Sequence, residues 1–327
     1  WTTIIEMVNK KIVLNVCGVK SLGGLKLFLE SFDYFAESGN KLIVLYSELP
    51  FYKDLQNQFL DSELVKFVYV KQKRFLHPYL NFFLSRSTKE KINSSNAIIH
   101  YGNFGFKTKI KSFVLIQNVL PLVKNDFRNS LLRYFILRSS KISDHVLVQL
   151  EHLKDYLPVE ERNKIIEIGE IVEKSVPLSN TNGGIVCFGS EIPNKNFQFI
   201  LKALKNISNR NRITIINPVS NIKEFSCVTT SNNAETMKIL SENEIYFHAS
   251  NFETVGLPLY EAQELGLKVV APSSPYTQYF DKDSTFLYEV NNVNDAVEKI
   301  NLAIESKSEN IQALNYSENW GKVLRLI

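Results

Sequence analysis

KIVLNVCG, residues 11–18, and GIVCFG, residues 184–189, are two short apolar runs that each end in glycine. A buried run of this length, followed by a polar turn and an amphipathic helix, is typical of a βα unit on a parallel sheet. Apolar residues at helical spacing follow both runs, between Leu25 and Phe35 and between Phe197 and Leu204. The repeated opening predicts an α/β chain with two Rossmann-like, doubly wound domains.

Further short apolar runs predict the remaining strands, at 42–46, 64–70, 97–100, 113–117, 146–149, 213–216, 245–248 and 268–271. A stretch rich in Pro, Ser and Asn between 167 and 181 predicts the domain boundary. We expect an amino-terminal domain over residues 1–170 and a second domain over 171–308. The last segment, 309–327, is expected to form a helix that packs back on the first domain. Doubly wound sheets bind ligands at the carboxyl ends of their strands, so a cleft between the domains is the expected site.

The composition is that of a globular protein, with 44% hydrophobic and 22% charged residues in 327. It excludes a disordered chain, a collagen and a disulfide scaffold. No apolar run approaches about 18 residues, so no membrane-spanning helix is expected. Residues 1–8 lack the pattern of a signal peptide, and the three cysteines have no metal-binding spacing. A cytoplasmic protein with reduced thiols is therefore expected.

Positive charge is concentrated between Lys66 and Lys141, where fifteen Lys and Arg residues face only Glu90 and Asp126. Aromatic residues are interleaved with these cations along the same segment. A field of this sign attracts polyanions such as anionic lipid or pyrophosphate. The alternative is a solvated basic face around an aromatic core. No recognition motif for nucleic acid accompanies the charge, so nucleic acid is not expected as a partner.

The segment NFETVGLPLYEAQELGLKVVAP, residues 251–272, contains the richest chemistry of the chain. Gly256 permits a tight turn, Pro258 suits the first helical turn, and Gly266 suits the helix end. Amides at such a helix start bind phosphate, and the carboxylates of Glu253 and Glu261 can accept hydrogen bonds from a vicinal diol. Acidic residues near a helix N-terminus are also favoured by its dipole, which is the alternative interpretation.

Glu253 and Glu261, with seven residues between them in ETVGLPLYEA and followed by GLKVVAP, resemble the signature of retaining glycosyltransferases of family four, which have the GT-B fold. An early Gly-Gly pair, a Lys-Asn loop in the second half and a tryptophan near the end occur in the family's order. The stretches 100–103 and 117–121 resemble bacterial members that build O-antigen and other surface polysaccharides. The resemblance implies two Rossmann-like domains that face a central cleft.

The resemblance also implies roles for individual residues. Glu261 would accept hydrogen bonds from the ribose of a nucleotide-sugar donor, and Glu253 would contact the transferred sugar as a catalytic residue. Backbone amides in the turn before the helix would hold the diphosphate; these belong to Val255, Gly256 and Leu257.

Lys195 gives separate support, because a cation just before a helix start near Asn196 is unfavourable unless an anion lies nearby. A diphosphate would supply that anion, and Lys195 would stabilise the leaving group. A solvated loop lysine is the alternative. The family usually has an arginine where Ser190 stands, so Ser190 is the departure in the donor-binding set.

In the first half, Gly23 and Gly24 would let the backbone approach the donor phosphates, although a plain tight turn explains them equally well. His100 ends an apolar strand, and the resemblance places it near the donor sugar or the acceptor hydroxyl as a second catalytic residue. A structural histidine is the alternative there.

The sequence thus predicts a retaining, metal-independent glycosyltransferase that needs no cofactor. Its partners would be a nucleotide-sugar donor, a saccharide acceptor linked to a lipid, and an anionic membrane surface at the cytoplasmic face of the inner membrane. Two alternatives stay open: a nucleotide-sugar epimerase of similar shape, and a non-catalytic protein that binds polyanions.

Overall fold

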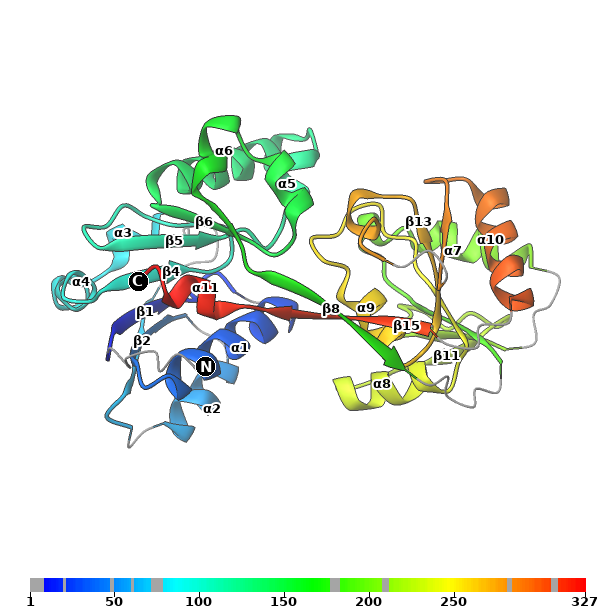
Figure 1. Ribbon diagram of the computed structural model, residues 1–327, viewed down its shortest axis with the longest axis horizontal. Helices are drawn as coiled ribbons and strands as arrows, with labels where there is room; N and C mark the ends of the chain where they lie inside the picture. Colours follow the sequence, from blue (N-terminus) through cyan, green and yellow to red (C-terminus); the bar gives the residue numbers. More distant parts are fainter. Residues whose placement is uncertain are drawn as a thin grey trace. The chain divides into compact units, whose positions relative to one another are not determined.

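The computed structural model describes residues 9–19, 22–47, 50–59, 62–71, 79–176, 183–207, 212–280, 284–306 and 311–327 (Figure 1). The chain divides into two compact units. Unit 1 comprises Trp1–Gly169 and Glu318–Ile327, and unit 2 comprises Glu170–Ser317. Among the described residues, no helix combines the length and the apolar character that crossing a bilayer requires.

Unit 1 is built on a seven-stranded sheet in the order β3-β2-β1-β4-β5-β6-β7. All neighbouring strands are parallel. The strands are β1 (Lys11–Asn15), β2 (Lys41–Tyr46), β3 (Val65–Tyr69), β4 (Ala97–His100), β5 (Lys111–Leu115), β6 (His145–Val148) and β7 (Ile165–Glu167). The chain winds outward from β1 in one direction and from β4 in the other, so β1 and β4 flank the topological switch point.

Helices cover both faces of this sheet. They are α1 (Leu22–Glu37), α2 (Pro50–Gln58), α3 (Leu80–Phe83), α4 (Arg86–Asn93), α5 (Leu120–Val123), α6 (Phe127–Ile142) and α11 (Trp320–Leu324), with 3₁₀ turns η2 (Glu151–Tyr156) and η3 (Val159–Lys164). Aromatic residues of α1 and Trp320 of α11 share one core cluster with strand residues. Residues of α3 and α4 form another with alternate strand residues such as Val13 and Ile98. The period-2 alternation of the strands thus supplies apolar surface to two helix layers.

Unit 2 is a six-stranded parallel sheet in the order β11-β10-β9-β12-β13-β14. Its strands are β9 (Ile185–Phe188), β10 (Ile213–Ile216), β11 (Ser226–Val228), β12 (Ile245–Phe247), β13 (Lys268–Pro272) and β14 (Thr285–Tyr288). Its helices are α7 (Phe197–Lys205), α8 (Asn233–Ser241), α9 (Leu257–Glu264) and α10 (Val293–Glu305), with turns η4 (Pro193–Lys195) and η5 (Pro275–Thr277). The switch point lies between β9 and β12. The expected pair of doubly wound, Rossmann-like domains is confirmed.

The end of the chain differs from the prediction. The segment 309–327 was expected to form a helix, but Ile311–Glu318 forms the strand β15, which pairs with β8 (Gly169–Val176) in a two-stranded sheet. The expected helix is reduced to the five residues of α11. The local pattern misleads because the hydrogen-bond partner of β15 is about 140 residues away in sequence.

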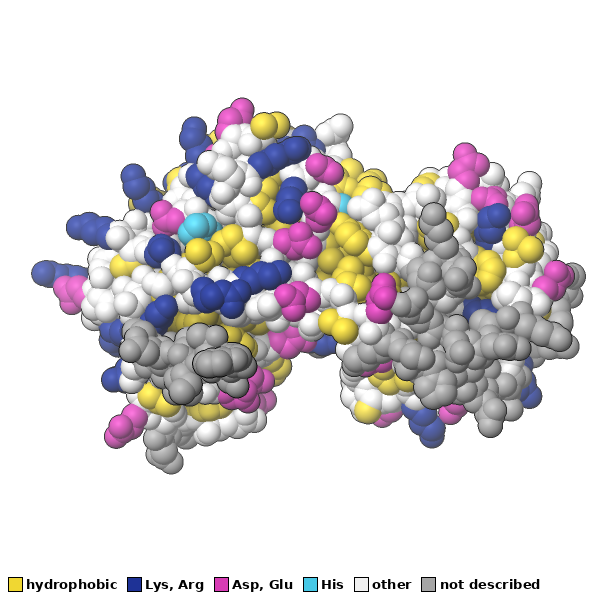
Figure 2. Space-filling view, viewed as in Figure 1, with side chains coloured by type: hydrophobic (Ala, Val, Ile, Leu, Met, Phe, Trp, Pro, Cys, Tyr) yellow, Lys and Arg dark blue, Asp and Glu magenta, His cyan; other side chains and the backbone are white. Residues whose placement is uncertain are grey.

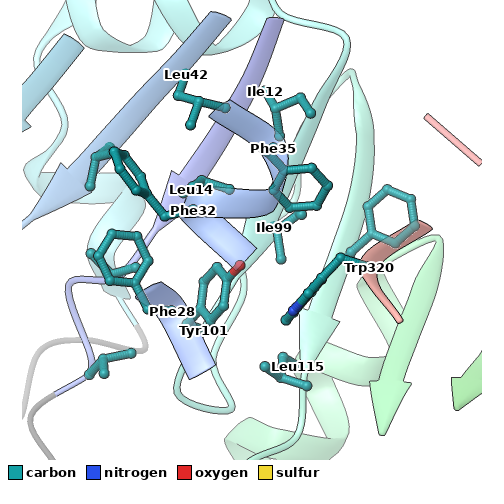
Figure 3. Packing of buried hydrophobic residues seen from close by; sticks show 14 of the residues in the cluster. Ile12, Leu14, Phe28, Phe32, Phe35, Leu42, Ile99, Tyr101, Leu115 and Trp320 are labelled. Atoms are coloured by element: carbon teal, nitrogen blue, oxygen red, sulfur yellow. The ribbon is translucent and has the colours of Figure 1, made fainter. Parts of the chain in front are cut away.

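Trp320 fastens this end of the chain to unit 1. Its side chain is almost fully buried, and its ring lies 5.8 Å from that of Phe35 and 6.1 Å from that of Tyr101 (Figure 3). Asn319 caps α11 through its side chain, which accepts from the backbone N–H of Lys322. A buried indole of this size contributes largely through area removed from water.

Replacing Trp320 with Ala should lower the free energy of unfolding of unit 1 by about 3–5 kcal/mol, because the truncation leaves a large cavity between α1 and the sheet. Urea unfolding followed by circular dichroism measures the change. Val159, which is largely exposed, provides the control, since V159A should change stability by no more than about 0.5 kcal/mol. Equal effects of the two substitutions would contradict this role of Trp320.

Candidate functional site

Two loops of unit 2 leave the sheet at its switch point, one after β9 and one after β12. The first runs through Gly189 and Ser190 to the single turn η4, and the second runs from His248 to Gly256. Gly189 has no room for a side chain, because a Cβ there would lie 2.5 Å from the Cα of Pro218. Gly256 adopts a left-handed backbone with φ of 77° and forms the N-cap of α9. Both loops therefore depend on glycine for their course.

Lys195 and Glu253 bring the two loops together in an ion pair. The Nζ of Lys195 donates to Oε1 of Glu253 at 2.5 Å. The side chain of Glu253 is mostly buried, and that of Lys195 is one-third exposed. The anion expected beside Lys195 is thus a side chain of the protein itself, the carboxylate of Glu253. This contact was not predicted from the sequence.

Asparagine side chains join the same two loops around the ion pair. The backbone N–H of Asn251 donates to the carbonyl of Asn194 at 2.8 Å, and the Asn194 side chain donates to the carbonyl of Phe252. Asn196, with a left-handed φ of 53°, donates from its side chain to Oδ1 of Asn251 at 3.4 Å. This clamp fixes the separation of the β9 and β12 loops. These contacts were not predicted from the sequence, where their one signal is the density of asparagine after each strand.

Two buried tyrosines form hydrogen bonds with the backbone of the loop that carries Glu253. The hydroxyl of Tyr276 donates to the carbonyl of Ser250 at 2.5 Å, and that of Tyr288 donates to the carbonyl of His248 at 2.9 Å. Both rings are nearly inaccessible to solvent. The sequence alone does not single out Tyr276, because a tyrosine after a strand is equally typical of a loop and of a core.

Glu253 is ionised in this setting. Burial is the largest single influence and acts to raise the pKa of its carboxyl group. The charge of Lys195, with His248 and the hydrogen bonds from Lys195 and Ser250, together outweighs burial, and the pKa lies below its usual range. Burial also lowers the pKa of His248, to about 4 against an ordinary 6.5. Its Nε2 lies 3.8 Å from Oε1 of Glu253 and its Nδ1 lies 3.1 Å from the Tyr246 hydroxyl. His248 is therefore a neutral imidazole beside a carboxylate at neutral pH.

Glu261 lies within α9 and is partly exposed. Burial raises the pKa of the Tyr246 hydroxyl, and the charges of Glu253 and Glu261 both add to that rise. The two carboxylates consequently act on the same buried hydroxyl, as expected for groups on one side of the sheet edge. The turn before α9 is formed by Val255 and Gly256, which are buried, and α9 has no side-chain N-cap.

Ser190 offers no positive charge to this site. Its Oγ accepts from the backbone N–H of Ile192 at 3.3 Å, and the following Glu191 is exposed. The groups of this loop that can hold an anion are therefore the amides of the turn and Lys195. Among the described residues, no group of His, Cys, Asp and Glu could hold a metal ion. Two further carboxylates, in the triplet Asp281-Lys282-Asp283, lie outside the described residues. Metal independence therefore stays a prediction.

The predicted residues of the first half lie in unit 1. Gly23 and Gly24 belong to the first turn of α1, whereas a loop was expected there. A Cβ at Gly23 would meet nothing within 4 Å, so the fold leaves room for a side chain at that position.

His100 lies at the carboxyl end of β4, beside the switch point of unit 1. It is fully buried, and its Nδ1 lies 2.9 Å from the side-chain nitrogen of Asn15 at the end of β1. Its ring packs against Phe106 with centroids 4.7 Å apart. This environment is that of a core histidine in the free protein, and a catalytic role for His100 stays a prediction.

Comparisons with known proteins agree with this architecture. Residues 220–322 match the family described as glycosyl transferases group 1, a segment that includes Glu253 and Glu261. No curated relative matches the chain. The solved structure of HepE from Anabaena with UDP and glucose has a TM-score of 0.66 at 12% identity, covering 91% of this chain and 90% of that one.

Two further solved structures are similar in fold. TarM has a TM-score of 0.64 at 14% identity, with 92% of this chain and 93% of that chain covered. WaaG, a glycosyltransferase involved in lipopolysaccharide biosynthesis, has a TM-score of 0.64 at 11% identity and covers 90% of each chain. The fold is thus the GT-B fold, and together with the family match it supports a glycosyltransferase.

The buried His248 should make unit 2 sensitive to acid. Between about pH 4 and 6.5 the unfolded chain binds a proton at this residue and the folded unit does not, so the free energy of unfolding falls as the pH is lowered. The lowered pKa of Glu253 adds a loss in the same direction below its unfolded value of 4.5.

Replacing His248 with Gln should remove about 3 kcal/mol of this pH dependence. Urea unfolding at neutral pH and near the acid end of the window, for both proteins, measures the difference between the two slopes. A variant that loses stability equally at both pH values, with the wild-type slope retained, would contradict the assignment.

Proposed function

We propose that the protein is a retaining glycosyltransferase that moves a sugar from a nucleotide-sugar donor to a saccharide acceptor without a metal ion. The observation that carries the proposal is the Lys195–Glu253 ion pair at the switch point of unit 2. Ligands of doubly wound sheets bind at that position. The family match over residues 220–322 and the UDP and glucose bound by HepE support a nucleotide-sugar donor.

The donor would exchange partners with this ion pair. Its diphosphate would bind Lys195 and the amides of Val255, Gly256 and Leu257, and Glu253 would then be free to accept hydrogen bonds from the sugar hydroxyls. Glu261 would accept from the ribose. A carboxylate is an acceptor at both positions, which suits hydroxyl donors. Lys195 would stabilise the charge that grows on the leaving phosphate, the type of electrostatic term that dominates such reactions.

Retention of configuration follows from attack on the same face. The bond between the anomeric carbon and the phosphate oxygen breaks, the acceptor hydroxyl oxygen bonds to that carbon, and its proton passes to the departing phosphate oxygen. No protein nucleophile is required. His248 is neutral and buried, so its part is to support the Glu253 loop.

The acceptor in this proposal is a saccharide linked to a lipid, used in O-antigen or other surface-polysaccharide synthesis at the cytoplasmic face of the inner membrane. The basic excess between Lys66 and Lys141 supports an anionic, membrane-bound acceptor. The involvement of WaaG in lipopolysaccharide biosynthesis points in the same direction.

A thermal-shift panel of UDP, GDP, ADP and dTDP tests donor binding. One of them, at about a hundredfold excess over its dissociation constant, should stabilise the folded protein by about 2.7 kcal/mol. Glu261→Gln should weaken that response, because a neutral amide accepts less strongly from the ribose. A protein stabilised by none of the four would refute the proposal.

Lys195→Met should reduce kcat/KM for the donor by about a hundredfold, because the leaving phosphate loses its cation. The control is Lys202→Met, an exposed lysine of α7 outside the site. Both variants are assayed for release of the nucleoside diphosphate, with and without acceptor. An unchanged rate for Lys195→Met would place the chemistry elsewhere, and sugar conversion without any acceptor would instead indicate an epimerase.

A further inference from the structure

Helix α6 is apolar on two faces. Its inner face is buried, with Ile136 in a core cluster of unit 1. Its outer face also carries large apolar side chains at helical spacing: Phe127 is 89% exposed, Tyr134 is 62% exposed, and Leu131 between them is exposed as well. A second, exposed apolar face on a surface helix indicates that a binding partner covers it.

The neighbouring helix α3 continues this apolar surface. Phe82 is 81% exposed and Phe83 is also exposed. The ring of Tyr79 connects the two helices, since it lies 6.5 Å from Phe82 and 5.3 Å from Phe135 of α6. The ring of Phe135 in turn lies 5.4 Å from that of Tyr134 on the outer face, so the outer face of α6 and the aromatic residues of α3 adjoin one another.

A cavity of about 330 Å³ opens beside this surface, between α3, α4 and the loop 106–109. Its apolar lining is supplied by Leu84, Ile92 and Phe106. Lys89, Lys107 and Lys109 also line it, and none of the three forms an ion pair with a residue in the described part of the chain. The loop is tied to α6 because the N–H of Gly105 donates to Oγ of Ser139 at 3.0 Å.

The exposed charge around this surface is mainly positive. Arg128, Arg138 and Lys141 are exposed on α6, and Figure 2 shows dark-blue side chains projecting around the α4 and α6 side of unit 1. The two acids of the region are engaged: Glu90 pairs with Arg86, and Asp126 caps α6. The surface therefore presents apolar rings within a positive field. An aqueous anion would leave the rings unburied, and a neutral apolar partner would leave the cations unmatched.

We propose that this surface docks on an anionic phospholipid bilayer, with the α3 and α6 rings in the headgroup layer and one lipid phosphate seated among Lys89, Lys107 and Lys109. The apolar lining of the cavity then accepts the first carbons attached to that phosphate. Helices with aromatic residues and flanking cations bind the interface in this way. The inference deepens the proposed function, since it rests on an acceptor that lies in the membrane.

Vesicle flotation of the full chain tests the surface. Vesicles of phosphatidylglycerol and phosphatidylcholine in equal parts should bind the protein, and pure phosphatidylcholine should not. The triple variant K89Q/K107Q/K109Q should weaken partitioning by about a hundredfold at low salt, as expected for three cations at an anionic surface. The variant F82S/F127S/Y134S should reduce the binding that persists at high salt, because that part is apolar.

The matched control is K202Q/K223Q/K238Q, which removes three exposed lysines of unit 2. Equal loss in the two lysine triples would show non-specific attraction and overturn the proposal, as would wild-type partitioning in the K89Q/K107Q/K109Q variant. A second arm uses short-chain dihexanoyl phosphatidic acid and inorganic phosphate below micelle formation. Tighter binding of the amphiphile, lost in the same triple, supports a lipid site, whereas equal binding of inorganic phosphate overturns it.

The nucleoside-diphosphate thermal shift separates this inference from the proposed function. All of these variants should retain the wild-type response, because none of the replaced residues belongs to the site of unit 2. Absence of vesicle binding with that response intact refutes the docking surface alone. Absence of the response with vesicle binding intact refutes the glycosyltransferase alone.

Discussion

The Lys195–Glu253 ion pair is the interaction on which the candidate site of unit 2 depends. A carboxylate as buried as that of Glu253 is costly unless a cation lies within hydrogen-bond distance, and Lys195 supplies one at 2.5 Å. The pair exists because β9 and β12 are neighbours whose chains depart in opposite directions. The asparagine clamp and the buried tyrosines then keep the two loops at the separation that the pair requires.

The same parallel arrangement explains why the fold could be predicted so far from sequence. Parallel strands buried on both faces are nearly continuous apolar runs, so KIVLN and GIVCF stand out against polar turns. The tail could not be predicted in this way. Residues 311–318 pair with β8, which precedes them in the sequence by most of the length of unit 2. Nothing in their local sequence pattern indicates that partner.

The charged residues of the site were predictable from the sequence, and the residues that hold its loops in place were not. Glu253 and Glu261 were singled out by the chemistry of their segment and its resemblance to a family motif, and Lys195 because a cation just before a helix start is unfavourable without an anion. The contact between Lys195 and Glu253 was not foreseen, because it depends on two loops 58 residues apart in sequence. Tyr276 and Tyr288 escaped because a buried tyrosine is ordinary until its hydroxyl partner is known. Gly23 and Gly24 show the converse, since a glycine pair suggested a loop where the helix had already begun.

Ser190, which stands where the glycosyltransferases that the sequence resembles usually have arginine, gives the ion pair a second consequence. With two cations, one could neutralise Glu253 while the other held a phosphate. Here Ser190 contributes only a hydroxyl, so Lys195 must serve Glu253 in the free protein and the diphosphate in the proposed complex. Binding the donor then costs the ion pair, and that cost is offset only if the released Glu253 finds hydroxyl donors on the sugar. A nucleoside diphosphate without its sugar leaves the carboxylate buried and unmatched. The intact nucleotide sugar should for this reason bind more tightly than the nucleotide alone, so that the departure at Ser190 makes the site selective for a loaded donor.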